Sequence, residues 1–144
     1  RTMTVPYDLD DDEQIAEYLE DASRIGVIGM KPEGPAQEVP EYMREQGYET
    51  VPVNPYYIDV DDIECVDRVN LIEDEVDIVN IFRRPESIRD HVHEIVMMDP
   101  QPKLVWFQLG IRNNDAAEEL AEEGIPVVQD RCIKVEHGRL LDKD

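Results

Sequence analysis

Lysine and arginine are scarce in this chain, and several of them directly follow apolar runs that resemble strands. The chain has 14 basic and 35 acidic residues. Five of the basic residues stand after predicted strands: Lys31, Arg83, Arg84, Arg131 and Lys134. Parallel strands end at one edge of a sheet, so these cations are expected to lie together, as a ligand with several phosphates requires. The alternative is that they stand there by chance or pair with nearby carboxylates.

Gly29 is the residue at which the first apolar run ends. The run Ile25-Gly26-Val27-Ile28 does not alternate, which is typical of a parallel strand covered on both faces. It is followed by Gly29-Met30-Lys31-Pro32. A turn of this kind that leads into a helix offers free N–H groups at the edge of the sheet, where a phosphate can bind.

Small and polar residues follow the other apolar runs at the same predicted edge. They are Asn54 and Pro55 after the second run, and Gln108 and Gly110 after the fourth. A dinucleotide site is the obvious alternative, but Gly26, Gly29 and Gly34 lack the G-x-G-x-x-G spacing. The second run also ends in Val53-Asn54 without the carboxylate that usually holds an NAD ribose. A nucleotide held mainly through its phosphates fits better than NAD.

The elements that position these residues alternate between strand and helix along the whole chain. Strands are predicted at residues 25–28, 48–53, 76–82, 103–107 and 125–128, and helices at 13–22, 35–47, 85–96 and 115–123. Pro40 predicts a kink in the second helix or a later start. Residues 59–74 and 130–137 allow no firm assignment. The alternation predicts an α/β fold with an open, mainly parallel five-stranded sheet, and we expect strand order 3-2-1-4-5.

The length of 144 residues fits a single domain, with residues 1–22 as a helical N-terminal extension. No apolar run reaches the roughly 18 residues of a membrane span, and no leader pattern precedes the first helix. Cys65 and Cys132 have no metal-ligand spacing. We therefore expect a reduced, cytoplasmic protein.

A cysteine and three histidines are candidates for catalysis or metal binding. Cys132 beside Arg131 is a candidate thiol nucleophile, which His137 could help to orient, but a buried, inert cysteine is favoured and a structural histidine explains His137 at least as well. His91 and His93 are two residues apart on a predicted helix and point to different faces, so a shared metal is not expected.

Four motifs, in this order, resemble the CoA-binding protein family, a group of small single-domain Rossmann-like proteins similar to the CoA-binding domain of the succinyl-CoA synthetase α subunit. The motifs are Gly47-Tyr48 with Pro52-Val53-Asn54-Pro55, then Asp77 to Pro85, Trp106 to Gly110, and Asp130 to His137. The resemblance covers about residues 24 to 141. It implies a three-layer Rossmann-like fold and a CoA or acyl-CoA ligand. It does not extend to the ligase chemistry, which uses a phosphorylated histidine in a second domain.

The resemblance also implies roles for individual residues. The Gly29 loop, with Met30 and Lys31, would hold the pyrophosphate, and Val53, Asn54 and Pro55 would approach the nucleotide. The adenine and ribose-phosphate region would be lined by Phe82, Arg83, Arg84 and Ile88. Gln108, Gly110 and Arg131 complete the predicted edge. The family commonly has Ser where this chain has Lys31, so a lysine charge would replace a hydroxyl.

We therefore expect a CoA-binding module without catalysis. The alternatives are an acyl-CoA-processing enzyme that uses Cys132 and His137, and a regulator that responds to NAD or a similar nucleotide.

The charge balance bears on partners and origin. The net charge is -21, which repels nucleic acid and anionic membranes. The carboxylates are interleaved with apolar residues, and 41% of the chain is hydrophobic, so a folded domain is favoured over a disordered polyanion. At molar salt the Debye length is about 3 Å, which screens the self-repulsion. We expect a salt-adapted source and a fold that is more stable in molar salt than in dilute buffer.

Overall fold

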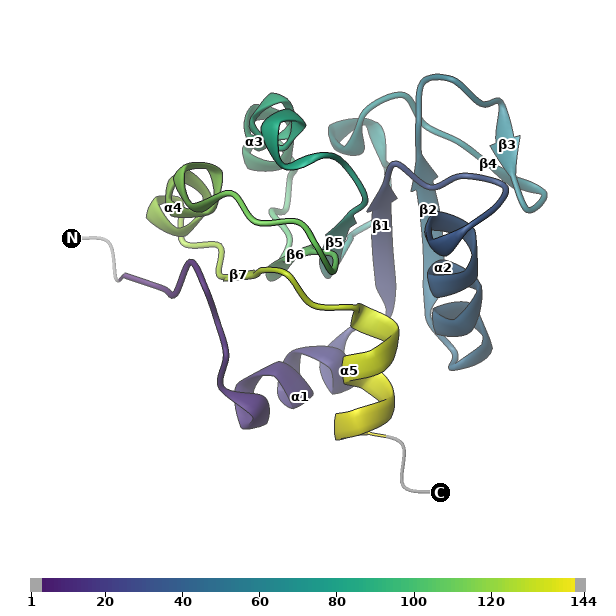
Figure 1. The fold of residues 1–144 in the computed structure, drawn as a ribbon. Coiled ribbons are helices and arrows are strands. Elements are labelled where there is room, and N and C mark those ends of the chain that lie inside the picture. The colour runs from purple at the N-terminus through teal and green to yellow at the C-terminus, as the bar shows by residue number, and fades with distance from the viewer. Residues whose placement is uncertain (1–3, 142–144) are drawn as a thin grey trace.

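The computed structural model describes residues 4–141, and within them a five-stranded sheet forms the centre of the molecule (Figure 1). Its strands are β1 (Arg24–Ile28), β2 (Glu49–Val53), β5 (Ile78–Ile81), β6 (Leu104–Phe107) and β7 (Val127–Val128). Every neighbouring pair in this sheet is parallel. The predicted α/β class with an open parallel sheet is confirmed. Residues 1–3 and 142–144 of the predicted domain lie outside the described residues.

The predicted strand order is wrong in one respect. The sheet runs β2-β1-β5-β6-β7, which is 2-1-3-4-5 in chain order, so the third strand pairs with β1 and not with β2. Pro52 supplies a physical reason. Proline has no N–H and is found on edge strands. On the outer side of β2 the Pro52 carbonyl accepts the Val66 amide at 3.0 Å and the Asn54 amide donates to the Val66 carbonyl at 2.9 Å, which makes an isolated bridge and not a further strand. β2 therefore forms the edge, and the strand order reverses between β1 and β5.

Five helices flank the sheet: α1 (Asp12–Asp21), α2 (Pro35–Glu45), α3 (Arg89–Val96), α4 (Asn114–Glu122) and α5 (Ile133–Leu140), with short 3-10 turns η1 (Val69–Leu71) and η2 (Pro85–Ser87). The Asp11 side chain accepts a hydrogen bond from the Gln14 amide and caps the start of α1. The Asn113 side chain accepts one from the Ala116 amide and caps the start of α4. None of the described helices combines the length and apolar character needed to cross a membrane.

The acidic segment that the sequence left unassigned forms a small hairpin. Its antiparallel strands are β3 (Asp59–Val60) and β4 (Ile63–Glu64). The two turn residues, Asp61 and Asp62, have φ angles of 53° and 62°, a left-handed conformation that aspartate tolerates better than most residues. The hairpin is tied to α2 because Arg44 forms an ion pair with Asp61 at 2.8 Å.

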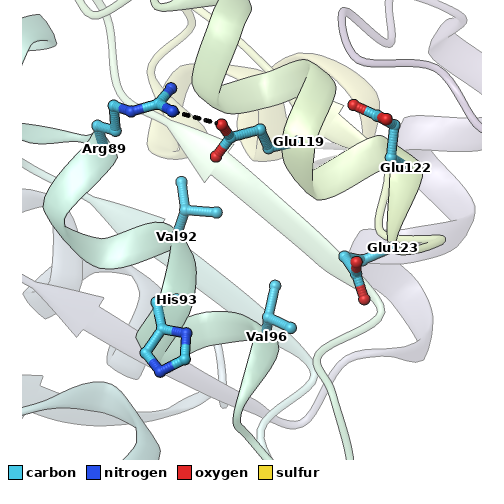
Figure 2. A pocket seen from close by; sticks show the side chains of 7 residues that line it. All are labelled: Arg89, Val92, His93, Val96, Glu119, Glu122 and Glu123. Carbon is cyan, nitrogen blue, oxygen red and sulfur yellow. Dashed lines mark ion pairs between the residues drawn. The ribbon is translucent and has the colours of Figure 1, made fainter.

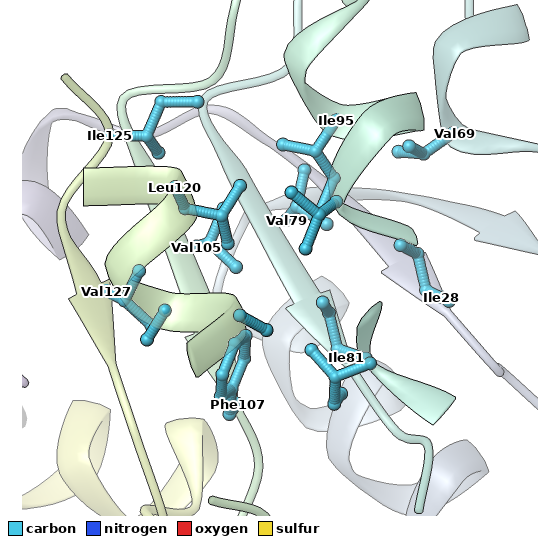
Figure 3. Packing of buried hydrophobic residues seen from close by; sticks show 14 of the residues in the cluster. Ile28, Val69, Val79, Ile81, Ile95, Val105, Phe107, Leu120, Ile125 and Val127 are labelled. Atoms are coloured by element: carbon cyan, nitrogen blue, oxygen red, sulfur yellow. The ribbon is translucent and has the colours of Figure 1, made fainter. Parts of the chain in front are cut away.

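The sheet is buried on both faces, which explains why its strands do not alternate. Val79, Ile81 and Phe107 pack with α3 and α4 on one face (Figure 3). Ile78 and Trp106 pack with α1, α2 and α5 on the other face. Helices on both faces of the sheet produce the three layers that the family resemblance implied.

The last helix and the first are joined by an ion cluster of four residues, Asp12, Arg131, Glu136 and Arg139. Arg139 contacts Asp12 at 2.7 Å and Glu136 at 3.0 Å, and Arg131 contacts Glu136 at 2.8 Å. The Glu136 side chain is only 10% exposed. The hydrogen bond from Arg139 is the main cause that lowers the pKa of Glu136 and of Asp12, although burial acts in the opposite direction.

This cluster predicts acid-sensitive stability. The folded-state pKa of Glu136 lies below its unfolded value of about 4.3, so its contribution is complete above about pH 5 and is lost as the pH falls through the lowered pKa. Glu136→Gln should lower the free energy of unfolding by about 1–3 kcal/mol at pH 7. The difference from wild type should shrink below about pH 4.

Denaturant unfolding at several pH values, at constant salt, measures both effects. Glu38→Gln is the matched control, because Glu38 is exposed on α2 and forms no ion pair within the described residues. A difference between Glu136→Gln and wild type that stays constant or grows toward low pH contradicts the assignment.

Candidate functional site

Gly29 lies where β1 ends between the ends of two neighbouring strands. Its amide donates to the Val53 carbonyl of β2 at 2.9 Å, and its φ angle is +86°. A Cβ at this position would overlap the Phe82 carbonyl oxygen at the end of β5. Only glycine fits both the conformation and the space. This point, where the strand order reverses, is the usual place for a ligand in an open α/β sheet.

A cavity of about 750 Å³ opens at this point. Four connections at the carboxyl edge of the sheet supply its walls, which are the segments after β1, β2, β5 and β6. Its lining residues are Gly29, Lys31, Glu33, Pro35, Ala36, Tyr57, Phe82, Arg83, Arg84, Pro85, Gln108, Leu109, Gly110 and Ile111. The cavity thus brings together residues that are far apart in the sequence.

Three cations in this cavity have no carboxylate partner among residues 4–141. They are Lys31, Arg83 and Arg84. Most other basic side chains in the described part of the chain form ion pairs: Arg24, Arg44, Arg89, Lys103, Arg112, Arg131 and Arg139. Arg68 and Lys134 are the other described basic residues without an ion pair, and neither lines this cavity. The arrangement suits an anionic ligand, although Glu33 also lines the cavity.

The other two predicted cations lie elsewhere. Arg131 is held in the ion cluster with Glu136, and it is not among the lining residues. The Lys134 ammonium lies 5.4 Å from the centroid of the Tyr42 ring. The predicted group of five cations is therefore reduced to three at the cavity.

Pro40 fixes the loop that carries Lys31. Proline in a helix has no N–H for the carbonyl four residues earlier, and its ring pushes that carbonyl away from the helix axis. The carbonyl in question belongs to Ala36, and it accepts the Lys31 amide at 3.2 Å. α2 begins at Pro35 as predicted, and the expected disturbance at Pro40 takes the form of a bond to the neighbouring loop.

The turn after β1 offers fewer free amides than the sequence predicted. The amides of Gly29 and Lys31 already donate to carbonyls, and Pro32 and Pro35 have none. The side chain of Lys31 is exposed at the cavity. Phosphate binding at this loop therefore depends more on side-chain charge than on backbone N–H groups.

Asn54 connects the loops that follow β1 and β2. Its amide nitrogen donates to the Met30 carbonyl at 3.0 Å, and its oxygen accepts the Tyr56 amide at 3.0 Å. Met30, Val53 and Ile88 are buried in the core, and Pro55 is exposed outside the cavity. All five of these residues were predicted to belong to the ligand site, but none of their side chains lines the cavity. They affect its shape only through the backbone that they support.

Asp130 fixes the loop after β6, and the sequence did not single it out as a site residue. Its carboxylate accepts the Gly110 amide at 2.7 Å, and its own amide donates to the Ile111 carbonyl at 3.1 Å. Its φ angle of 57° is uncommon for a residue other than glycine. Gln108, which is buried in the cavity wall, accepts the Asn80 side-chain amide at 3.3 Å.

The candidate catalytic pair lies apart from the cavity lining. Cys132 is the N-cap residue of α5, in an extended conformation, and His137 lies within the helix. The Nδ1 atom of His137 lies 2.9 Å from the Tyr42 hydroxyl. Tyr48 also packs edge-on against His137, and burial raises the pKa of Tyr48 to about 12. These contacts describe a histidine packed into the helix layer.

A second hollow, of about 400 Å³, lies between α3 and α4 (Figure 2). Figure 2 shows Arg89 reaching across it to Glu119, an ion pair of 2.7 Å. Glu122 and Glu123 add further negative charge, so the hollow does not favour an anion. His93 lines it, whereas His91 bonds Glu94, and the described residues contain no cluster of three metal-ligating side chains.

Comparison with known proteins assigns the family. Residues 23–138 match the model of the CoA binding domain. This chain belongs to that family. An uncharacterized protein of Bacillus subtilis (strain 168), YneT, is 35% identical over 127 residues, covering 87% of this chain and 93% of that one.

Solved structures of family-like proteins agree with the fold. A Thermus thermophilus protein, cell-free ID.343, is 41% identical, with a TM-score of 0.86 over 92% of this chain and 100% of that chain. A hypothetical protein from Pyrococcus horikoshii OT3 is 34% identical, with a TM-score of 0.88 over 98% and 99% of the two chains.

The role of Pro40 can be tested without a ligand. In Pro40→Ala the new amide should bond the Ala36 carbonyl within α2, and the Lys31 amide should exchange with solvent severalfold faster. Amide hydrogen exchange followed by NMR measures both sites. The control is Val39→Ala, which also shortens a buried side chain of α2 but adds no amide. Exchange of the Lys31 amide should then change only as far as the free energy of global unfolding changes. If exchange of the Lys31 amide is unchanged in Pro40→Ala, the Ala36 carbonyl accepts both amides, and the role assigned to Pro40 is wrong.

Proposed function

We propose that this protein binds coenzyme A or an acyl-CoA at the cavity between the ends of β1 and β5, and that it acts as a binding or regulatory module without catalysing a reaction. The observation that carries the proposal is the group of cations, Lys31, Arg83 and Arg84, which line one cavity and have no carboxylate partner among residues 4–141. CoA carries a pyrophosphate and a 3′-phosphate, which can pair with these three cations. Membership of the CoA binding domain family supports the same ligand.

In this proposal Lys31 and the Gly29 loop hold the pyrophosphate. The start of α2 lies close by, and its dipole favours negative charge. The amides of Gly29 and Lys31 are engaged within the protein, so the lysine charge takes the place of a serine hydroxyl and of loop amides.

Arg83 and Arg84 hold the 3′-phosphate, and the half-buried ring of Phe82 contacts the base. Arginine suits a phosphate because its planar group can donate two parallel hydrogen bonds. A pair of arginines next to an aromatic ring therefore matches the phosphorylated ribose of CoA better than the unphosphorylated riboses of NAD.

A binding role is favoured over catalysis by the placement of the candidate nucleophile. Neither Cys132 nor His137 lines the cavity, so neither side chain is positioned beside a ligand bound there. Hydrolysis of an acyl-CoA by the purified protein, if abolished by Cys132→Ala, would establish the enzyme instead.

Calorimetric titration with CoA, dephospho-CoA and NAD tests the proposal. Wild type should bind CoA more tightly than either of the other two. The double variant Arg83→Gln/Arg84→Gln should bind CoA about 10- to 100-fold more weakly, because charge-assisted hydrogen bonds to phosphate are lost. The same variant should no longer distinguish CoA from dephospho-CoA.

Arg68→Gln is the control variant. Arg68 is exposed, has no ion pair among the described residues, and lies outside the cavity, so its loss removes the same charge without touching the site. Equal affinity of wild type for CoA and dephospho-CoA contradicts the arginine assignment. Tighter binding of NAD than of CoA contradicts the proposed function.

A further inference from the structure

Exposed large apolar side chains occur on two of the loops that form the cavity: two of them line it, and two more adjoin one of these in the chain. We call this group the apolar rim, and its members are Tyr56, Tyr57, Ile58 and Leu109. Ile58 is 87% exposed and Leu109 is 66% exposed. Tyr57 and Leu109 line the cavity, and Tyr56 and Ile58 flank Tyr57 in the chain. The other exposed large apolar residues in the described chain come singly from separate elements: Tyr7, Leu71, Met97 and Val135.

The backbone that presents the apolar rim is held in place. The Tyr56 amide donates to Asn54, and the Ile58 carbonyl accepts the Cys65 amide at 2.9 Å. On the other side, the Gly110 amide donates to Asp130, which fixes the residue next to Leu109. Apolar side chains on a fixed backbone, left open to water beside a ligand cavity, indicate a surface that something apolar covers.

Phosphates do not need this rim, since the cations inside the cavity serve them. Phe82 already offers an aromatic ring within the cavity for a base. Ile58 and Leu109 are aliphatic. A saturated hydrocarbon chain can pack against aliphatic side chains in any orientation. The occupant must also be continuous with the phosphate-bearing ligand, because Tyr57 and Leu109 belong to both the rim and the cavity.

We propose that the apolar rim binds the hydrocarbon chain of an acyl-CoA, so that the protein distinguishes medium-chain acyl-CoA thioesters from free CoA. This inference rests on the proposed CoA binding at the same cavity. The cations hold the shared CoA part, and the rim adds affinity in proportion to the length of the chain it covers.

Titration of wild type with CoA, acetyl-CoA, butyryl-CoA and octanoyl-CoA, below the concentration at which the last forms micelles, tests the inference. Affinity should rise about twofold for each methylene on an open rim, up to about fourfold for a methylene that is fully buried. Ile58→Ser should flatten this dependence and leave the affinity for free CoA unchanged. Leu109→Ser should also flatten it, whereas Leu71→Ser, which removes an equivalent exposed leucine elsewhere, should not.

The outcomes separate the two proposals. If CoA binds but wild-type affinity is independent of chain length, the inference is wrong and the proposed function stands. If neither CoA nor any thioester binds, both fail. Light scattering on the same samples tests whether the rim binds a second copy of this chain. That assignment would hold if the wild type is a dimer, Ile58→Ser is a monomer, and the dependence of affinity on chain length is the same in both.

Discussion

The close approach of Gly29 to the Phe82 carbonyl is the constraint on which the site depends. β1 lies between β2 and β5, and its end has room for a backbone but not for a side chain. The loop that follows is therefore brought against the loop of Arg83 and Arg84. Because the strand order reverses between β1 and β5, the connections that follow them lead away on either side and leave the cavity open. The placement of the cations follows from this strand order.

Three cations that are unpaired within the described chain distinguish this cavity from the hollow between α3 and α4. The protein carries a net charge of -21, and its carboxylates pair most of the described basic residues. Lys31, Arg83 and Arg84 have no carboxylate partner among residues 4–141, and they line one cavity at the edge of the sheet. Pro40 holds the first loop through the Ala36 carbonyl, and Asp130 holds the loop opposite it through Gly110. Residues outside the cavity thus determine where its charges and its apolar rim lie.

Much of the fold could be predicted because its signals are local. Uninterrupted apolar runs indicated the buried strands, and the helix predicted at residues 115–123 differs from α4 by one residue at each end. The strand order could not be read from periodicity, since it depends on which strands pair. Pro52 was nonetheless a local signal that β2 belongs at an edge. The hairpin at Asp61 and Asp62 was missed because two aspartates in the left-handed conformation do not stand out in an acidic segment.

The candidate site was predicted in outline, and the structure separates its members by burial and pairing. Val53 ends a strand and Met30 and Ile88 follow strands, but a linear pattern does not show which side chains turn into the core. Arg131 pairs with nearby Glu136 and also with Asp12 at the other end of the chain, a contact that no local pattern reveals. Tyr57 and Leu109 had no signal beyond being apolar residues in loops.

A crystal structure of the protein with CoA tests the central claim most directly. The account predicts that the pyrophosphate lies between Gly29 and Lys31, with the 3′-phosphate within hydrogen-bond distance of Arg83 or Arg84. CoA bound elsewhere, for example in the hollow between α3 and α4, or phosphates turned away from these three cations, would contradict it.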